Sequence, residues 1–220
     1  MSAPSMPSAP TAYPARLEVD YTLEHNRVTT LFRVVLVIPI AVVLGALTAG
    51  ATTRIYYEGS GQTLTRSSGG IVAGLFVATL LMILFRQRYP RWWFDFAREL
   101  TRFSARIGAY VLLLTDEYPS TTEEQRVHLD IDYPDAERDL NRWLPLVKWF
   151  LAIPHYIVLI ILFFGAIIAV WIAWFAILFT GRYPRGIFDF VEGVMRWENR
   201  VAGYAFTLVT DKYPPFSLDA

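Results

Sequence analysis

A duplicated motif is the feature that most constrains the fold of this chain. Arg-Tyr-Pro-Arg followed by Phe-Asp-Phe occurs at residues 88–96 and again at 182–190. A short Asp-Tyr segment, an Asn-Arg pair and an Ile-Pro pair precede each copy in the same order, and Thr-Asp-x-Tyr-Pro follows it. Duplication on this scale predicts an architecture built from two similar units. The matching segments are 17–21 and 129–133, 26–27 and 141–142, 38–39 and 153–154, and 115–119 and 210–214.

Long apolar runs predict an integral membrane protein. Hydrophobic residues make up 54% of the 220 residues, and they are clustered. Val34–Ala49 and Ile71–Phe85 carry no charge, and Trp149–Thr180 contains one ionisable residue, His155. A helix satisfies its own backbone hydrogen bonds, so runs of this kind are typical of membrane spans.

The repeat predicts four transmembrane helices arranged as two tandem hairpins. The first hairpin comprises Leu31–Ala49 and Gly70–Phe85, separated by a polar loop. The second repeat has one apolar run that is too long for the ~30 Å hydrocarbon core. We therefore expect a span over Leu144–Phe164, a tight turn near Gly165, and a return span over Gly165–Thr180. Three spans remain the alternative.

The positions of the basic residues predict the orientation. Arginine and lysine cluster before the first span, between the second and third, and after the fourth. The loop between the first two spans has only Arg54 and Arg66. The positive-inside rule then places both termini in the cytoplasm of a multi-pass inner-membrane protein. Three spans would put the last basic cluster outside. Both repeats enter the membrane in the same direction, which predicts a pseudo-two-fold axis along the membrane normal.

Each second span is followed by a segment with apolar residues at helical spacing and arginines on the opposite face, which predicts an amphipathic interfacial helix. Arg16–Tyr21 and Val127–Tyr133 alternate apolar and polar residues, as strands do. Tyr110–Thr115 and Tyr204–Thr210 are apolar and are also expected to be strands. Pairing within each repeat would form a small cytoplasmic β-sheet.

The organisation along the chain follows from these elements. Residues 1–14 are rich in Ser, Ala and Pro and are expected to form a disordered N-terminal tail. The first repeat covers 15–120, a linker covers 121–126, and the second repeat covers 127–216.

The paired span, the Arg-Tyr-Pro-Arg…Phe-Asp-Phe box and the closing Thr-Asp-x-Tyr-Pro segment resemble the bacterial domain-of-unknown-function (DUF) family forty-three eighty-nine. The resemblance covers nearly everything after Tyr13, with the unit in tandem. The copies differ at Trp92-Trp93 against Gly186-Ile187. The family has no established reaction, so the resemblance implies a membrane architecture and no catalytic residues.

The sequence predicts no catalytic, cofactor-binding or metal-binding residues. It contains no cysteine, which excludes disulfides and thiolate chemistry, and it lacks a Gly-rich phosphate loop and a metal-ligand cluster. Asp95 and Asp189 fall near helix starts, where a carboxylate stabilises the backbone dipole and pairs with a nearby arginine. General acid–base chemistry by these residues is the alternative.

His155 is an intramembrane ionisable residue, which is a functional hypothesis by default. A structural role is the competing interpretation, because Pro154 frees a backbone carbonyl that a histidine could satisfy. Arginines on the interfacial helices are candidates for anionic-lipid headgroup contacts. These are Arg88, Arg91, Arg102, Arg106, Arg182, Arg185, Arg196 and Arg200.

The function expected from these features is that of a non-catalytic accessory or scaffolding subunit in a membrane complex. Its partners would be the lipid bilayer and either a second copy or a larger protein assembly, with no cofactor. The net charge of zero gives no argument for nucleic acid. The first alternative is a small transporter or channel formed between repeats or protomers. The second is an interfacial lipid-modifying enzyme acting through Asp95, Asp189, Asp116 or Asp211.

Overall fold

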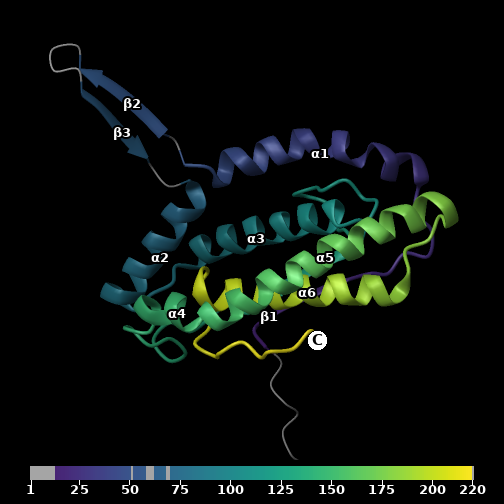
Figure 1. Cartoon of the computed structure of the whole chain (residues 1–220). Helices are drawn as coiled ribbons and strands as arrows, with labels where there is room; N and C mark the ends of the chain where they lie inside the picture. Colours follow the sequence, from purple (N-terminus) through teal and green to yellow (C-terminus); the bar gives the residue numbers. More distant parts are fainter. Residues whose placement is uncertain (1–12, 51, 58–61, 68–69, 220) are drawn as a thin grey trace, which may run out of the picture.

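The computed structural model describes residues 13–50, 52–57, 62–67 and 70–219, so the tail predicted at 1–14 falls almost entirely outside it. The described part is mainly helical, with two small two-stranded sheets (Figure 1). In chain order the elements are β1 (Ala15–Val19), α1 (Arg27–Thr48), β2 (Thr52–Tyr57), β3 (Gln62–Ser67), α2 (Ile71–Arg86), α3 (Arg91–Val111), β4 (Val127–Ile131), α4 (Pro145–Leu151), α5 (Ile153–Thr180) and α6 (Arg185–Ala205).

The helices and the β1–β4 sheet form layers. The amphipathic helices α3 and α6 occupy the middle: α3 contacts both α1 and β4, and α6 contacts both α5 and β1. The apolar helices α1 and α5 therefore lie on one side of the middle layer, and the sheet lies on the other. In Figure 1, α1 is the uppermost of the helices, whereas β1 and the C-terminus lie in the lower part of the view.

The β1–β4 sheet joins the two repeats. β1 and β4 pair antiparallel, and Leu17 lies opposite Leu129. These leucines occupy the same position in the duplicated strand motif, so a pseudo-two-fold axis passes between them. Alternate side chains of both strands are buried, as the period-two pattern predicts. The pairing predicted within each repeat is wrong, because each repeat supplies one strand of a shared sheet.

The strands predicted at 110–115 and 204–210 are also wrong. In both segments the amphipathic helix continues, through Val111 in α3 and through Ala205 in α6. Each helix then ends in a turn where Leu113 (φ 66°) or Leu208 (φ 56°) has a left-handed backbone. Both leucines are buried in the main core. The apolar runs therefore reflect burial of a helix end.

The predicted turn near Gly165 is wrong, because α5 runs without a break from Ile153 to Thr180. Its buried residues His155, Ala166, Ala173 and Ile177 are separated by whole numbers of helical turns. They therefore form a single stripe, which a turn at Gly165 would disrupt.

The breaks in the second repeat occur at other positions. α4 ends at Leu151, and α5 begins next to Pro154, which lacks the N–H that a continuous helix would require. α5 ends at Thr180, and its C-cap Gly181 has a φ of +75°, which only glycine readily adopts; the box proline Pro184 follows.

By the repeat alignment, α1 corresponds to α4 together with the first part of α5, and α2 corresponds to the rest of α5. The β2–β3 hairpin separates α1 from α2, within the loop predicted to be polar, and projects away from the helices at their junction (Figure 1). In the described part of the chain, α1 and α5 are long and apolar enough to cross a membrane, whereas α2 is a shorter apolar helix. Four transmembrane helices are therefore not shown.

Candidate functional site

The tyrosine of each Arg-Tyr-Pro-Arg box binds the opposite repeat. The carbonyl of Tyr89 accepts a hydrogen bond from the hydroxyl of Tyr133, and the carbonyl of Tyr183 accepts one from the hydroxyl of Tyr21 at 2.7 Å. Burial raises the pKa of Tyr89 to about 12 and also raises the pKa of Tyr183. The two box hydroxyls therefore stay protonated at neutral pH. The duplicated box is thus an inter-repeat contact.

A buried arginine connects the start of α1 to the segment after α3. Arg33 donates hydrogen bonds to the carbonyls of Tyr110 and Thr115 and pairs with the carboxylate of Asp116. Its guanidinium also lies 4.2 Å from the centroid of the Tyr110 ring. The second oxygen of Asp116 accepts from the backbone N–H of Asn26, the N-cap of α1, at 2.7 Å. We call this cluster the first clasp.

The second clasp has the same design in the second repeat. Lys148 Nζ lies 2.6 Å from Asp211 Oδ1 and donates to the carbonyl of Thr210 at 2.7 Å. It also lies 5.1 Å from the centroid of the Tyr204 ring, and Asp211 accepts from the backbone N–H of Asn141. Lys148 is 0% exposed. Burial lowers the pKa of its amine, and the contact with Asp211 opposes that shift.

Equivalent arginines of α3 and α6 cover the outer edges of the shared sheet. Arg102 Nη2 donates to the carbonyl of Leu129 in β4, and Arg196 Nε donates to the carbonyl of Leu17 in β1, both at 3.0 Å. An uncovered strand edge invites pairing with another chain. The two predicted headgroup contacts Arg102 and Arg196 therefore face the sheet.

The other six arginines predicted to contact headgroups occupy three kinds of position. Arg106 and Arg200 are buried, and donate to the carbonyls of Ser120 and Ser217. Arg91 stacks over the ring of Tyr133, 4.8 Å from its centroid, and Arg185 stacks over the ring of Tyr21, 4.5 Å from its centroid. Arg88 and Arg182 are exposed at the ends of the apolar helices. Headgroup contact stays a prediction for all eight.

The box aspartates pair with the arginines of the same motif. Asp95 lies 4.0 Å from Arg91 Nε and 3.5 Å from Arg98, and Asp189 lies 2.9 Å from Arg185 Nε. These are pairs three or four residues apart on a helix surface, where opposite charges stabilise the helix modestly.

His155 lies in an aromatic cluster between α5, α6 and the C-terminal segment. Its ring is 0% exposed and stacks on Phe216, with 4.0 Å between the centroids, and it lies 4.7 Å from the ring centroid of Tyr213. Its Nδ1 lies 3.1 Å from Trp197 Nε1, whose N–H has only a donor role, so Nδ1 is the acceptor. The intramembrane candidate is thus enclosed by rings on several sides.

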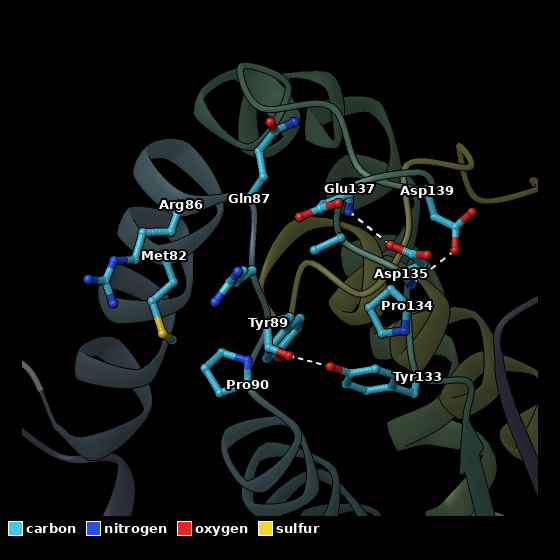
Figure 2. Close-up of a pocket in the computed structure, with 12 residues that line it drawn as sticks. Met82, Arg86, Gln87, Tyr89, Pro90, Tyr133, Pro134, Asp135, Glu137 and Asp139 are labelled. Carbon is cyan, nitrogen blue, oxygen red and sulfur yellow. Dashed lines mark hydrogen bonds between the residues drawn. The ribbon is translucent and has the colours of Figure 1, made fainter.

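A cavity of about 780 Å³ lies where the end of α2 meets the loop after β4. Figure 2 shows Arg86 directed away from the acidic residues on the opposite wall. Two of the three carboxylates bind their own loop: Asp135 accepts from the N–H of Glu137 at 3.1 Å, and Asp139 accepts from the N–H of Asp135 at 3.0 Å. The cavity therefore offers a polar wall without a convergent set of reactive groups.

A second cavity, of about 990 Å³, lies on the polar side between β1, α6 and the C-terminal segment. We call it the polar groove. The carboxylates of Glu18 and Asp130 line it from the exposed face of the sheet. Within the described residues, no group of three or more His, Asp or Glu side chains is placed to hold a metal ion.

Two central residues were missed as site residues from the sequence, namely Arg33 and Lys148. Each is seven residues after the asparagine of a duplicated Asn-Arg pair. Alignment of the repeats could therefore have singled them out. Asp116 and Asp211, named as enzyme candidates, are the partners of these two cations.

Comparison with known families supports the tandem organisation. The family described as Domain of unknown function (DUF4389) matches residues 65–122 and 143–217, which together exceed half of the chain. The chain belongs to this family and carries two tandem copies of its unit. Comparison with curated proteins and with solved structures finds no match.

Proposed function

We propose that this chain is a non-catalytic membrane protein that acts as an accessory or scaffolding subunit of a membrane complex. The apolar helices would hold it in the bilayer. The opposite side, formed by the exposed face of the β1–β4 sheet and the polar groove, would bind a partner protein. The observation that carries this proposal is the separation of the two surfaces. In the described part of the chain, Arg33 is the only residue of α1, α2 and α5 that takes part in an ion pair.

The apolar side supports a bilayer location. Buried residues make up 17% of the most apolar window of α1 and 11% of that of α5, although both windows are strongly hydrophobic. The core helix of a soluble protein buries such surface, because exposing it to water costs roughly 25 cal/mol per Å². Contiguous exposed apolar surface of this kind marks a membrane or protein interaction site.

The polar side supports partner binding. Glu18 and His128 face each other across the exposed side of the sheet, as do Arg16 and Asp130. The polar groove continues this charged surface to the C-terminal segment. The basic residues that flank the apolar helices favour a cytoplasmic location for this side and for both termini.

The alternatives have less support. Asp116 and Asp211 would be the natural candidates for acid–base chemistry, but both already neutralise buried cations. A transport path would need polar groups along the apolar helices, and His155 is packed among aromatic rings. Neither arrangement provides the convergent groups that an active site requires.

Native purification in a mild detergent tests the proposal. We expect the tagged chain to partition with membranes and to elute with a partner or as an oligomer. Reversing two groove carboxylates, Glu18→Lys with Asp130→Lys, should release the partner without unfolding the chain. The matched control is Glu123→Lys, an exposed carboxylate outside the groove. A chain that elutes alone and monomeric from native membranes would contradict a scaffolding role.

A further inference from the structure

Both ends of α5 are attached to segments that flank α6 and β1. Next to its start, the hydroxyl of Tyr213 donates to the carbonyl of Leu151 at 3.2 Å, and Lys148 is held in the second clasp. At its end, the carbonyl of Gly181 accepts from the backbone N–H of His25 at 2.8 Å. Each contact joins α5 to segments that flank α6 or β1. The two ends of the helix are therefore at the same level of the molecule.

The helix α6 also follows α5 along its length in the opposite direction (Figure 1). Ala152, at the start of α5, packs in one cluster with Tyr204 near the end of α6. Midway, Gly165 lies against the ring of Phe190. Near the end of α5, Ile177 shares the main core with Phe188. With 28 residues, α5 is about 42 Å long, and it lies flat on the layer that contains α6.

The charged residues of α6 argue against an orientation in which α5 crosses the bilayer. If α5 ran through the bilayer, α6 would run beside it and carry its ionised groups into hydrocarbon. A charged side chain at the bilayer centre costs about 2.5–3.5 kcal/mol or more. The charged residues of α6 are Arg185, Asp189, Glu192, Arg196, Glu198 and Arg200.

The helix α1 has the same relation to α3. Arg33, in its second turn, is held by the first clasp at the end of α3. Further along, Ile40 packs with Phe103 and Ile107 of α3. α1 thus also lies along an amphipathic helix that carries charge on its other face.

The outward face of both helices is apolar and wide. Val34 is 79% exposed on α1, and Phe164 and Phe179 are 63% and 78% exposed on α5. A helix with its side chains is about 10–12 Å across, whereas one leaflet contributes about half of the ~30 Å hydrocarbon core. One layer of helices lying flat would therefore fit within a single leaflet.

We infer that α1 and α5 lie parallel to the bilayer plane, embedded in the acyl chains of one leaflet, with α3 and α6 at headgroup level. The inference rests on the proposed membrane location and specifies its geometry. The pseudo-two-fold axis between Leu17 and Leu129 then runs along the membrane normal. The segments on either side of α5 stay on the same face of the membrane.

A nitroxide depth scan along α5 tests this geometry in the full chain reconstituted into phospholipid vesicles. The protein has no cysteine, so single cysteines can be introduced without a background to remove. The exposed positions Ile157, Ile161, Phe164, Ile168 and Phe175 lie on the outward face over about five helical turns. The readout is the ratio of collisions with oxygen, which enriches in hydrocarbon, to collisions with a water-soluble nickel chelate. A flat helix gives the same depth at all five positions.

The other outcomes distinguish a failure of the flat orientation from a failure of the proposed function. A depth that is greatest near Phe164 and falls toward both ends would mean that α5 crosses the bilayer. That result overturns the inference and leaves the membrane location intact. Nitroxides shielded from both reagents and broadened by a second label would show that another copy covers the face, which also overturns it. A chain that stays in solution, with water-exposed labels throughout, would refute the proposed function itself. Glu18→Cys on the exposed sheet face supplies the aqueous reference.

Discussion

At the residue scale, two buried cations connect the elements of each repeat. Arg33 and Lys148 occupy equivalent positions and pair with the equivalent carboxylates Asp116 and Asp211. Each carboxylate also accepts a backbone N–H at the start of a helical segment. Removing one partner of a buried pair leaves an uncompensated charge, which destabilises a fold far more than the loss of an exposed pair.

We predict that Asp211→Asn lowers the free energy of unfolding by about 3–5 kcal/mol, because Lys148 stays buried without its counter-charge. The amide oxygen can still accept the N–H of Asn141, so the effect reports the charge. Equilibrium unfolding of the detergent-solubilised protein measures it. Adding Lys148→Met should restore much of the loss, since neither charge then remains.

The matched control is Asp189→Asn, which removes a pair whose carboxylate is half exposed. Helix-surface pairs of this spacing contribute about 0.3–0.5 kcal/mol. Equal losses for Asp189→Asn and Asp211→Asn would contradict the structural role of the second clasp.

The first clasp predicts acid sensitivity. Partial burial raises the pKa of Asp116, but contacts with His25, the N–H of Asn26 and Arg33 outweigh burial and hold this pKa below its ordinary value of 3.8. A depressed pKa contributes stability that is present above the ordinary value and is lost as the pH falls through the folded value. We expect the unfolding midpoint to drop in acid below about pH 4, and Asp116→Asn to remove part of that dependence. An identical pH profile for the variant would contradict this linkage.

At the element scale, the continuity of α5 was not predictable from the sequence. The six helices correspond to apolar or amphipathic periods that could be recognised, and β1 and β4 follow from their alternation. Whether Trp149–Thr180 forms one helix or two could not be decided from composition, because glycine occurs both in turns and within helices. The deciding contacts are made with α6, which is distant in sequence.

The same limit explains the candidate site. The duplicated box was evident from the sequence, but the residue that it contacts was not. Tyr89 and Tyr133 are 44 residues apart in the sequence and meet only when the chain folds. Asp95 and Asp189 were expected to pair with nearby arginines, and such local pairs are predictable from helical spacing. The clasps depend on contacts between residues more than sixty positions apart.

Gly165 provides a direct test of the continuous helix. A Cβ at this position would lie 3.5 Å from the Phe190 ring, which is ordinary van der Waals contact. We expect Gly165→Ala to be neutral or to stabilise the chain by up to about 1 kcal/mol, because alanine favours a helix interior over glycine. Thermal unfolding in detergent measures this. Clear destabilisation would favour a turn at this position.

At the scale of the whole molecule, the duplicated motifs of each repeat make their contacts with the other repeat. Each repeat supplies one strand of the shared sheet, and each box binds the tyrosine that follows the strand of the other repeat. A single copy would expose a strand edge and leave buried tyrosines without partners. The tandem arrangement therefore provides two halves of one folded body.

This interdependence predicts that the halves complement each other. Fragments 1–120 and 121–220, expressed together, should purify as a complex through a tag on either one. Each fragment expressed alone should be degraded or aggregate. Charge substitution at Leu17 in the first fragment should abolish association, since Leu17 lies opposite Leu129 at the centre of the sheet. Independent folding of either fragment would contradict this interdependence.

The sidedness of three single cysteines tests the flat, one-leaflet arrangement most directly. Glu137→Cys lies before α4, Arg182→Cys lies between α5 and α6, and Gln62→Cys lies in β3. A membrane-impermeant maleimide is applied to sealed vesicles of each orientation. With α1 and α5 lying in one leaflet, all three cysteines label from the same side. Labelling of Gln62→Cys from the opposite side would show that α1 and α2 cross the membrane, and opposite labelling of Glu137→Cys and Arg182→Cys would show that α5 does.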